Sequence, residues 1–285
     1  MDGKKHNAKR KKRVVGKRVR IAVFIAFFIG IILSVFQYFR FVSKTVYEES
    51  VSHLTEIFHQ SDHMLKELTD KNLTYLHMWG EYLKSTSGES EIRDYIEKAQ
   101  EDAGFLNFYF LSADGNYKMV TGENGYLGLQ ENMEEEIRQG NDVITNVAVP
   151  GKSQMLVFAT PRAHGSYQGF EYDAIAIAYE NSDIIKVLDI SVFNGNAQSY
   201  VVHPDGRVVV DHSSESWGKV YNFFGILREH SNMSEEEILS ISEKFNAGHT
   251  DAMLVNLDGR NYYLVYEKSD IQDWMFLGLV QADIV

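Results

Sequence analysis

The stretch "SYVVHPDGRVVVDH", residues 199–212, predicts a β-hairpin. Two runs rich in β-branched residues flank a turn in which Pro204 fixes φ and Gly206 accepts a left-handed conformation. The stretch also holds two common metal ligands, His203 and His212. At about 3.3 Å per residue along an extended strand they lie on the order of 20 Å apart, too far to share one ion. We therefore interpret the stretch as a hairpin and predict no metal and no cofactor.

A second stretch, "FYFLSADGNYKMV" at residues 108–120, has the same form, and the turn glycines of the two stretches are 91 positions apart. Two further pairs of strands follow in the same order, and each strand of the second pair runs into the start of a helix. The repeated order predicts two copies of one unit of about 90 residues. The two further pairs are "MLVFAT" at 155 with "YLVYEK" at 263, and "AIAIAYENSDII" at 174 with "MFLGLVQADIV" at 275.

The ends of the chain differ in charge. Residues 1–20 carry ten Lys or Arg and one Asp, whereas residues 41–285 carry 17 basic and 39 acidic side chains. Between them the uncharged run at residues 21–39 is long enough to cross a hydrocarbon core roughly 30 Å thick. The positive-inside rule then predicts a cytoplasmic N-terminus and export of residues 41–285. A cleaved signal peptide is the main alternative, but the run is longer than usual and no A-x-A-like site follows it.

The basic tail has a simpler cause than nucleic-acid binding, because its position next to the apolar run makes it a topology signal that anionic lipid can assist. The chain contains no cysteine, which excludes disulfides, Cys-ligated zinc and thiol catalysis. G-x-S-x-G, H-E-x-x-H and P-loop motifs are also absent. His59 and His63 have a spacing that can hold zinc, but the sequence offers no clear third ligand. No catalytic residue is predicted, and the chain as given is not expected to be an enzyme.

A helical pattern runs from Phe41 to about Leu83, with one seam at three- and four-residue steps. This seam could dock on the protein's own globular part or on a second copy, and a polar Asn72 within it would suit a homodimer through the long helix. A second helix is expected near 92–100. A third is expected in "SEEEILSISEKF", with a capping box. The seam residues are Val51, Leu54, Phe58, Leu65, Leu68, Tyr75, Trp79 and Tyr82, and the capping box pairs Ser234 with Glu237.

An anchor helix, a long exported helix and two PAS-like units, the second ending in "IQDWMFLGLVQ", resemble the double Cache extracytoplasmic sensor domains of bacterial receptors. The resemblance covers residues 40–285 and implies an α+β fold with antiparallel sheets. Family members usually continue through a second membrane span to a histidine kinase, a GGDEF diguanylate cyclase or a chemotaxis output, and that descending helix would begin near Val285. The expected organisation is a basic tail (1–20), a transmembrane helix (21–39), a signalling helix (40–86), a membrane-distal module (87–195) and a membrane-proximal module (196–285).

The ligand of such sensors usually binds in the distal module, which directs attention to "PRAHGSYQGFEYDAIAIAYE" at residues 161–180. Arg162, Tyr167, Tyr172 and Asp173 offer a cation, two aromatic rings and a carboxylate, a set able to orient a small polar or zwitterionic ligand. The alternative is a polar connecting loop with ordinary surface charges. The amino-acid-binding members carry Arg followed by Trp-Tyr; here "AHGSY" follows the Arg, so amino-acid specificity does not carry over.

These features predict the extracytoplasmic, small-molecule-sensing region of a membrane-bound receptor in two-component, chemotactic or cyclic-di-GMP signalling. Its expected partners are an unknown small molecule, the lipid bilayer and a second copy of the chain, with no nucleic acid. Two alternatives remain open. A membrane-anchored extracytoplasmic enzyme would need an acid/base pair facing a deep pocket, and a surface adhesion or scaffold protein would expose a broad apolar patch.

Overall fold

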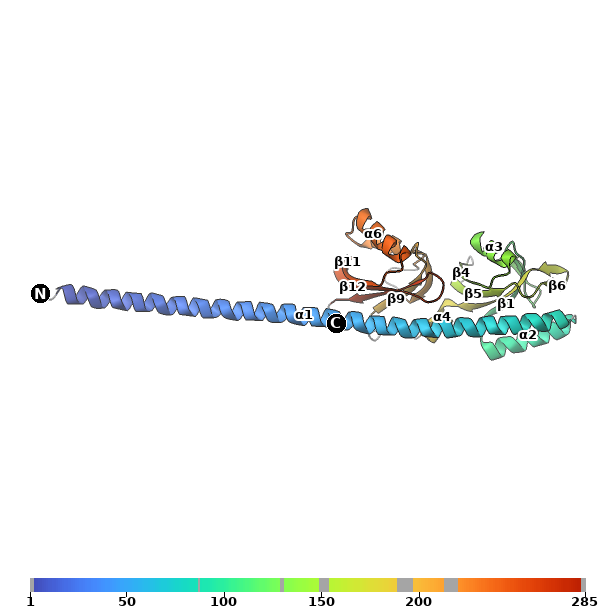
Figure 1. Ribbon diagram of the computed structural model, residues 1–285, viewed down its shortest axis with the longest axis horizontal. Coiled ribbons are helices and arrows are strands. Elements are labelled where there is room, and N and C mark those ends of the chain that lie inside the picture. Colours follow the sequence, from blue (N-terminus) through green and yellow to red (C-terminus); the bar gives the residue numbers. More distant parts are fainter. Residues whose placement is uncertain are drawn as a thin grey trace. The chain divides into compact units, whose positions relative to one another are not determined.

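The computed structural model describes residues 3–86, 88–128, 131–148, 154–188, 197–212 and 220–282 (Figure 1). The chain divides into two compact units, Met1–Ser50 and Val51–Val285. Helix α1, Gly3–Ser85, contributes to both of them. The expected boundary between modules at residues 195 and 196 and the expected start of a descending helix at Val285 lie outside the described residues.

In the first unit, α1 carries large apolar side chains that are exposed. Within the described residues it is the one helix whose length and apolar composition are sufficient to cross a membrane, and its most apolar window has no buried residue. Such a surface is unfavourable in water and favourable in a hydrocarbon core. The predicted N-terminal apolar helix is therefore confirmed. Its most exposed large side chains include Phe24, Phe27, Phe28, Phe36 and Phe39.

In the second unit, one face of α1 is buried against the protein's own sheets. Of the two docking surfaces that the seam allowed, the structure uses this one. Asn72 is fully buried and its Oδ1 accepts a hydrogen bond of 2.9 Å from the Tyr179 hydroxyl, so its assignment to a dimer seam is wrong. The buried residues recur every three or four positions, and they are Leu54, Phe58, Ser61, Leu65, Thr69, Asn72, Leu76, Trp79 and Leu83.

The first module follows α1 and comprises Glu89–Leu188. Helix α2 ends at Gly104, whose φ of 74° is left-handed, and the chain then enters a six-stranded antiparallel sheet of order β3-β2-β1-β8-β5-β4. In Figure 1, α3 lies on one face of this sheet, and α1 and α2 lie on the other. The elements are α2 (Glu89–Ala103), β1 (Asn107–Leu111), β2 (Asn116–Lys118), β3 (Asn124–Tyr126), α3 (Glu131–Gln139), β4 (Val143–Ala148), β5 (Gln154–Thr160), β6 (Gly165–Tyr167), β7 (Phe170–Tyr172), β8 (Ala174–Glu180) and α4 (Asn181–Leu188).

The second module comprises Ala197–Gln281 and has a five-stranded antiparallel sheet of order β10-β9-β13-β12-β11. Helices α5 and α6 pack on one face of this sheet, and α1 packs on the other through Leu54 and Phe58. The elements are β9 (Ala197–Val202), β10 (Val208–His212), α5 (Phe223–His230), α6 (Glu235–Asn246), β11 (Asp251–Leu257), β12 (Arg260–Lys268) and β13 (Met275–Gln281).

The two modules are copies of one plan, as the repeat predicted. The strand order β2-β1-β8-β5-β4 of the first sheet matches β10-β9-β13-β12-β11 of the second. The hairpin turns also match: Gly115 N donates to Ser112 O at 3.0 Å, and Gly206 N donates to His203 O at 2.8 Å. Both glycines have φ of 84°, a left-handed value that side chains with a Cβ rarely adopt. The α+β fold with antiparallel sheets is confirmed.

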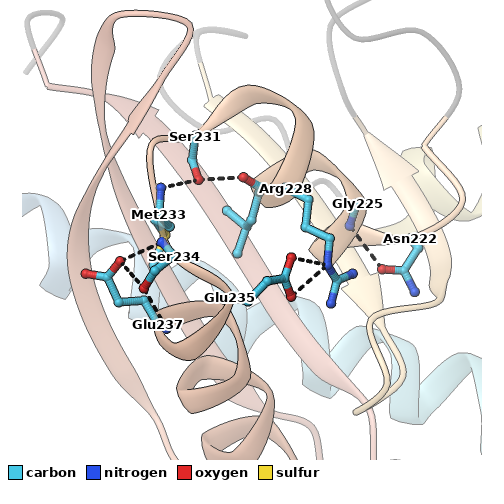
Figure 2. A network of polar contacts seen from close by, with 9 residues as sticks. Asn222, Gly225, Arg228, Ser231, Met233, Ser234, Glu235 and Glu237 are labelled. Atoms are coloured by element: carbon cyan, nitrogen blue, oxygen red, sulfur yellow. Dashed lines mark hydrogen bonds and ion pairs between the residues drawn. The ribbon is translucent and has the colours of Figure 1, made fainter.

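Local hydrogen bonds set the helix ends of the second module (Figure 2). The Asn222 side chain accepts a bond of 3.2 Å from Gly225 N at the start of α5. Ser234 and Glu237 form the predicted capping box of α6, in which each side chain accepts from the other residue's backbone N–H. Arg228 of α5 pairs with Glu235 of α6 at 3.0 Å. The Asn222 contact and the capping box satisfy N–H groups at the helix starts that have no partner within the helix.

Candidate functional site

The face of the first sheet that α3 covers carries small side chains in its two central strands. Four buried alanines lie on this face in the central strands β5 and β8, and we call it the alanine face. One row across the sheet pairs Tyr109 with Ala176 and Ala176 with Ala159. Alanine extends only one carbon above the sheet, and Met133 and Ile137 of α3 belong to the same buried cluster as this row. The alanines are Ala159, Ala174, Ala176 and Ala178.

The corresponding row of the second sheet is filled. It pairs Tyr200 with Leu277 and Leu277 with Tyr266, all fully buried. The ring of Phe223 lies 5.7 Å from that of Tyr200, and the ring of Phe245 lies 4.8 Å from that of Tyr266. Tyr109 and Tyr200 are equivalent in the repeat, being 91 positions apart like the turn glycines. The two copies thus differ in the strands beside this tyrosine, where one has alanines and the other has large side chains.

Polar groups lie at one side of the alanine face. The Tyr109 hydroxyl accepts a hydrogen bond of 2.9 Å from Asn107 Nδ2, and the Tyr117 ring meets that of Tyr109 edge to face at 4.8 Å. Burial is the main cause that raises the pKa of Tyr109 to about 12; the Asn107 hydrogen bond opposes it, and the Tyr117 hydroxyl and the Glu123 carboxylate add to it. The phenol therefore stays neutral at physiological pH and keeps a proton to donate.

Two of the predicted site residues, Tyr167 and Tyr172, lie on the opposite side of this sheet. Their rings pack against Phe110, at 4.3 Å and 5.0 Å between centroids, within the core that the sheet shares with α1 and α2. The Tyr167 hydroxyl donates to Val120 O at 3.3 Å. Burial raises the pKa of Tyr172. The structure thus brings these two tyrosines together and uses both to fill space between the β6–β7 hairpin and the sheet.

Asp173 and Arg162 are exposed and lie at different places. Asp173 joins β7 to β8, and its Oδ2 accepts a bond of 2.7 Å from Ala113 N in the β1–β2 turn, beside the alanine face. Arg162 lies beside α1, where a Cβ on Gly80 would come within 3.3 Å of Ala163 and 3.8 Å of the Arg162 backbone. Of the four predicted residues, Asp173 is the one with a contact at the edge of the alanine face.

The alanine face was missed in the sequence, although a signal for it was present. The alternation "AIAIAY" at 174–179 stands where the other copy has "MFLGLV" at 275–280. Both stretches predict buried strands, and only a side-by-side comparison shows that one copy has alanine where the other has Met275, Leu277 and Leu279. These three side chains belong to the core between the second sheet and its helices.

The hairpin quoted first has a structural role. Arg207 N donates to Asp205 Oδ1 at 3.0 Å and closes the turn. The His203 ring packs edge to face on Trp274 at 5.8 Å, and its Nε2 lies 3.3 Å from Asn146 Oδ1 of the first module. Burial lowers the pKa of His203, so the ring is neutral at physiological pH. In the described part of the chain, no three His, Asp or Glu side chains are grouped to hold a metal ion.

Neither a family model nor a curated protein sequence matches the chain. Its fold is similar to that of the sensory domain of the Campylobacter jejuni chemoreceptor Tlp3 with isoleucine bound, with a TM-score of 0.52 and 10% identity over 86% of this chain and 97% of the other. It is also similar to the ligand-binding domain of the Pseudomonas aeruginosa amino acid chemoreceptor PctB in complex with L-Gln, with a TM-score of 0.58 and 14% identity over 81% and 91%.

The fold is the double Cache fold. A further solved structure with this fold, the extracellular domain of the proposed histidine kinase mmHK1S-Z3, has a TM-score of 0.55 and 12% identity, covering 85% of this chain and 96% of that one. The Tlp3 structure is a sensory domain and the PctB structure is a ligand-binding domain. At such low identity the likeness concerns the fold, and the site must be argued from the residues of this chain.

Proposed function

We propose that the chain is the extracytoplasmic sensing region of a membrane-bound receptor and that its small-molecule ligand binds at the alanine face. The contrast between the two copies supports this assignment. The row Tyr109, Ala176, Ala159 carries two alanines where the row Tyr200, Leu277, Tyr266 carries large side chains. A protein interior is normally packed to high density, so small side chains in one copy alone indicate volume reserved for another molecule.

Polar groups at the edge of the alanine face would orient the ligand. The neutral Tyr109 hydroxyl can donate a hydrogen bond, and the exposed Asp173 carboxylate can accept one from an ammonium or amide group. Isoleucine and L-Gln are bound by two sensory domains of the same fold. We propose a small polar or zwitterionic ligand here, with Asp173 in direct contact. Arg162, Tyr167 and Tyr172 remain proposed contributors, the two tyrosines by holding the β6–β7 hairpin.

Binding would control signalling through the membrane. We propose that the N-terminus is cytoplasmic and that residues 41–285 are outside, because ten basic residues precede the apolar segment of α1. A ligand can shift the balance between two arrangements of the modules only in proportion to its different affinity for them. In double Cache receptors of this kind the output is a histidine kinase, a diguanylate cyclase or a chemotaxis protein. The proposed role is binding without catalysis.

We also propose a homodimer through α1. The partly buried Met64 and Leu68 line an open cleft of about 510 Å³, together with Val187 of α4, which is 40% exposed. Because the chain has no cysteine, a Met64→Cys variant would carry the only thiol. In membranes it should form a disulfide-linked dimer under mild oxidation, whereas Lys66→Cys, on an exposed position of α1, should not. Equal cross-linking of both variants would contradict the proposed dimer contact at Met64.

A thermal-shift screen of the full chain in lipid nanodiscs against small polar metabolites tests the ligand site. Ala176→Leu fills the row with the side chain that the second copy carries, so it should abolish the shift that a hit produces. The matched control Ala252→Leu, on a strand of the second sheet, should keep that shift. Asp173→Ala should weaken it. Hits that survive Ala176→Leu unchanged would refute the alanine face as the ligand site.

A further inference from the structure

A separate cleft of about 350 Å³ lies between α1 and α2, on the side of the first sheet away from the alanine face. This volume is within the range of small-molecule sites in proteins. The lining is mostly apolar and comes from both helices. From α1 come Tyr75, Met78 and Trp79, and from α2 come Tyr95, Lys98, Ala99, Asp102 and Ala103.

Aromatic side chains of α1 and two alanines of α2, Ala99 and Ala103, line the cleft. The rings of Tyr75 and Trp79 stack at 5.6 Å, and Trp79 is anchored against Phe105 and Phe108 of the core, at 5.5 and 6.1 Å. The α2 residues opposite them include Ala99, which cannot reach across the gap. Tyr82 of α1 and Tyr95 of α2 stack at 4.0 Å between ring centroids and hold the helices together beside the cleft. The aromatic wall is therefore rigid, and the gap is not closed by rotating one side chain.

Two opposite charges line the same cleft. Lys98 and Asp102 are four residues apart on α2, so their side chains project from the same face of the helix about 6 Å apart at Cβ. Both side chains are exposed. Within the described part of the chain, neither makes an ion pair. An ammonium and a carboxylate thus stand free, one helical turn apart, at the mouth of an apolar slot.

We propose that the cleft between α1 and α2 is a second small-molecule site, for a zwitterion with an aromatic or branched apolar body. The body would lie against Tyr75, Trp79 and Ala99, where burying apolar surface is favourable. The carboxylate of the ligand would pair with Lys98, and its ammonium would pair with Asp102. Charged hydrogen bonds of this kind fix orientation, and two of them select a zwitterion over either single ion. A molecule bound here bridges α1 and α2 and would fix their spacing.

Isothermal titration of the full chain in nanodiscs with three indole probes tests the site. L-tryptophan carries both charges, tryptamine lacks the carboxylate, and indole-3-propionate lacks the ammonium. We expect L-tryptophan to bind most tightly. Lys98→Met should weaken the binding of L-tryptophan and indole-3-propionate by about tenfold or more and leave the binding of tryptamine unchanged. Asp102→Asn should weaken the binding of L-tryptophan and tryptamine only. Failure of all three probes to bind at millimolar concentration would overturn the proposal.

Two filling variants separate this cleft from the alanine face. Ala99→Leu should abolish L-tryptophan binding, and Met78→Ala, at a side chain 53% exposed, should weaken it without a risk to folding. Ala176→Leu should leave it unchanged. Loss of binding in Ala176→Leu alone would assign the probe to the alanine face and refute the second site. A change of oligomeric state in Ala99→Leu with L-tryptophan binding intact would mean that a second copy of the chain occupies the cleft.

Discussion

The side chain of Asn181 pairs with the backbone of Asp211 as a neighbouring strand would. Asn181 Nδ2 donates to Asp211 O at 2.9 Å, and Asp211 N donates to Asn181 Oδ1 at 3.1 Å. Asp211 lies on β10, the edge strand of the second sheet, and Asn181 directly follows β8, which carries three alanines of the alanine face. A second first-module asparagine, Asn146 on β4, donates to Val208 O of β10 at 2.8 Å. The first module therefore satisfies edge groups that would otherwise lack strand partners.

Replacing Asn181 with Ala should destabilise the protein because two backbone groups of β10 lose their partners at once. Leaving such groups unpaired costs about 1–3 kcal/mol. We expect a lower thermal midpoint and faster amide exchange at Asp211, measured by hydrogen exchange with mass spectrometry. Asn141→Ala, which removes only a local bond to Glu136, is the matched control. Unchanged exchange in β10 would contradict the strand-like role of Asn181.

Tyr179 and Asn72 form a buried pair that joins β8 to α1. Tyr179→Phe should cost about 1–3 kcal/mol in unfolding free energy, because it leaves Asn72 Oδ1 buried without its donor. The double variant Tyr179→Phe/Asn72→Leu should recover most of that loss, since it also removes Asn72 Nδ2, which is buried without a partner in the described structure. Urea unfolding of the full chain in nanodiscs measures both. Additive losses in the double variant would show that the pair is not coupled.

Gly278 on β13 sets how closely α1 approaches the second sheet. A Cβ there would lie 2.8 Å from Phe58 Cζ and 3.2 Å from Leu54 Cδ2. We therefore expect Gly278→Ala to lower the unfolding free energy by about 1–3 kcal/mol, the usual cost of overpacking. Combining it with Phe58→Leu should cost less than the sum of the two single changes.

The control for this change is Gly225→Ala in α5, where a Cβ meets no atom within 4 Å. Alanine is favoured over glycine within a helix, so this variant should be neutral or slightly stabilising. Equal losses at both glycines would mean that backbone freedom, and not contact with α1, explains the effect.

Glu267 makes the contact between β12 and α1 sensitive to pH. Its Oε1 lies 3.2 Å from His59 Nε2, and its Oε2 is buried without a partner in the described structure. Burial raises the pKa of Glu267 above its ordinary 4.5; attraction to His59 opposes this, and the Asp62 carboxylate adds to it. The folded state thus binds the proton more tightly than the unfolded state does. This contribution is complete below pH 4.5 and is lost as the pH rises through the folded-state pKa.

We therefore expect Glu267→Gln to gain stability relative to the unmodified chain as the pH rises from 4.5 to 7. Thermal midpoints across this range measure the effect. Glu243→Gln, at an exposed position on α6, should run parallel to the unmodified chain. A Glu267→Gln curve that also runs parallel would show that the two states bind this proton equally.

Much of the fold could be predicted from local signals. The D-G turns at Gly115 and Gly206, the alternating strands and the Ser234–Glu237 capping box each depend on a few neighbouring residues, and the structure confirms them. The helical period of α1 predicted the buried face in part. Leu54, Phe58, Leu65 and Trp79 are buried, but Val51, Leu68, Tyr75 and Tyr82 are half-buried, and Thr69, Leu76 and Leu83 are buried instead of the last three. The period did not identify the surface that covers that face, because Asn72 meets Tyr179 across 107 positions of sequence. Such a pairing follows from how the sheets fold and not from local pattern.

The candidate site was harder to predict for the same reason. Tyr167 and Tyr172 have the composition of ligand-contacting residues, but the β6–β7 hairpin turns their rings toward Phe110. The bend at Asp173 interrupts the alternation of side chains between β7 and β8. The alternation along β8 therefore does not predict on which side of the sheet the side chains of β7 lie. The alanines, by contrast, carry no chemistry that a motif search would find. Their small size stands out only when equivalent rows of the two sheets are compared.

The difference between the rows also leads us to expect different responses of the two modules to heat. The second module packs Tyr200, Leu277 and Tyr266 in this row, whereas the first carries the smaller Ala176 and Ala159, where we propose that a ligand binds. With the proposed ligand at a hundred times its dissociation constant, we expect the first module to gain about 2.7 kcal/mol in unfolding free energy. Calorimetry should resolve two endotherms, of which ligand moves only the first. The unfolding of the second module would then serve as a control, within the same chain, for ligand binding to the first.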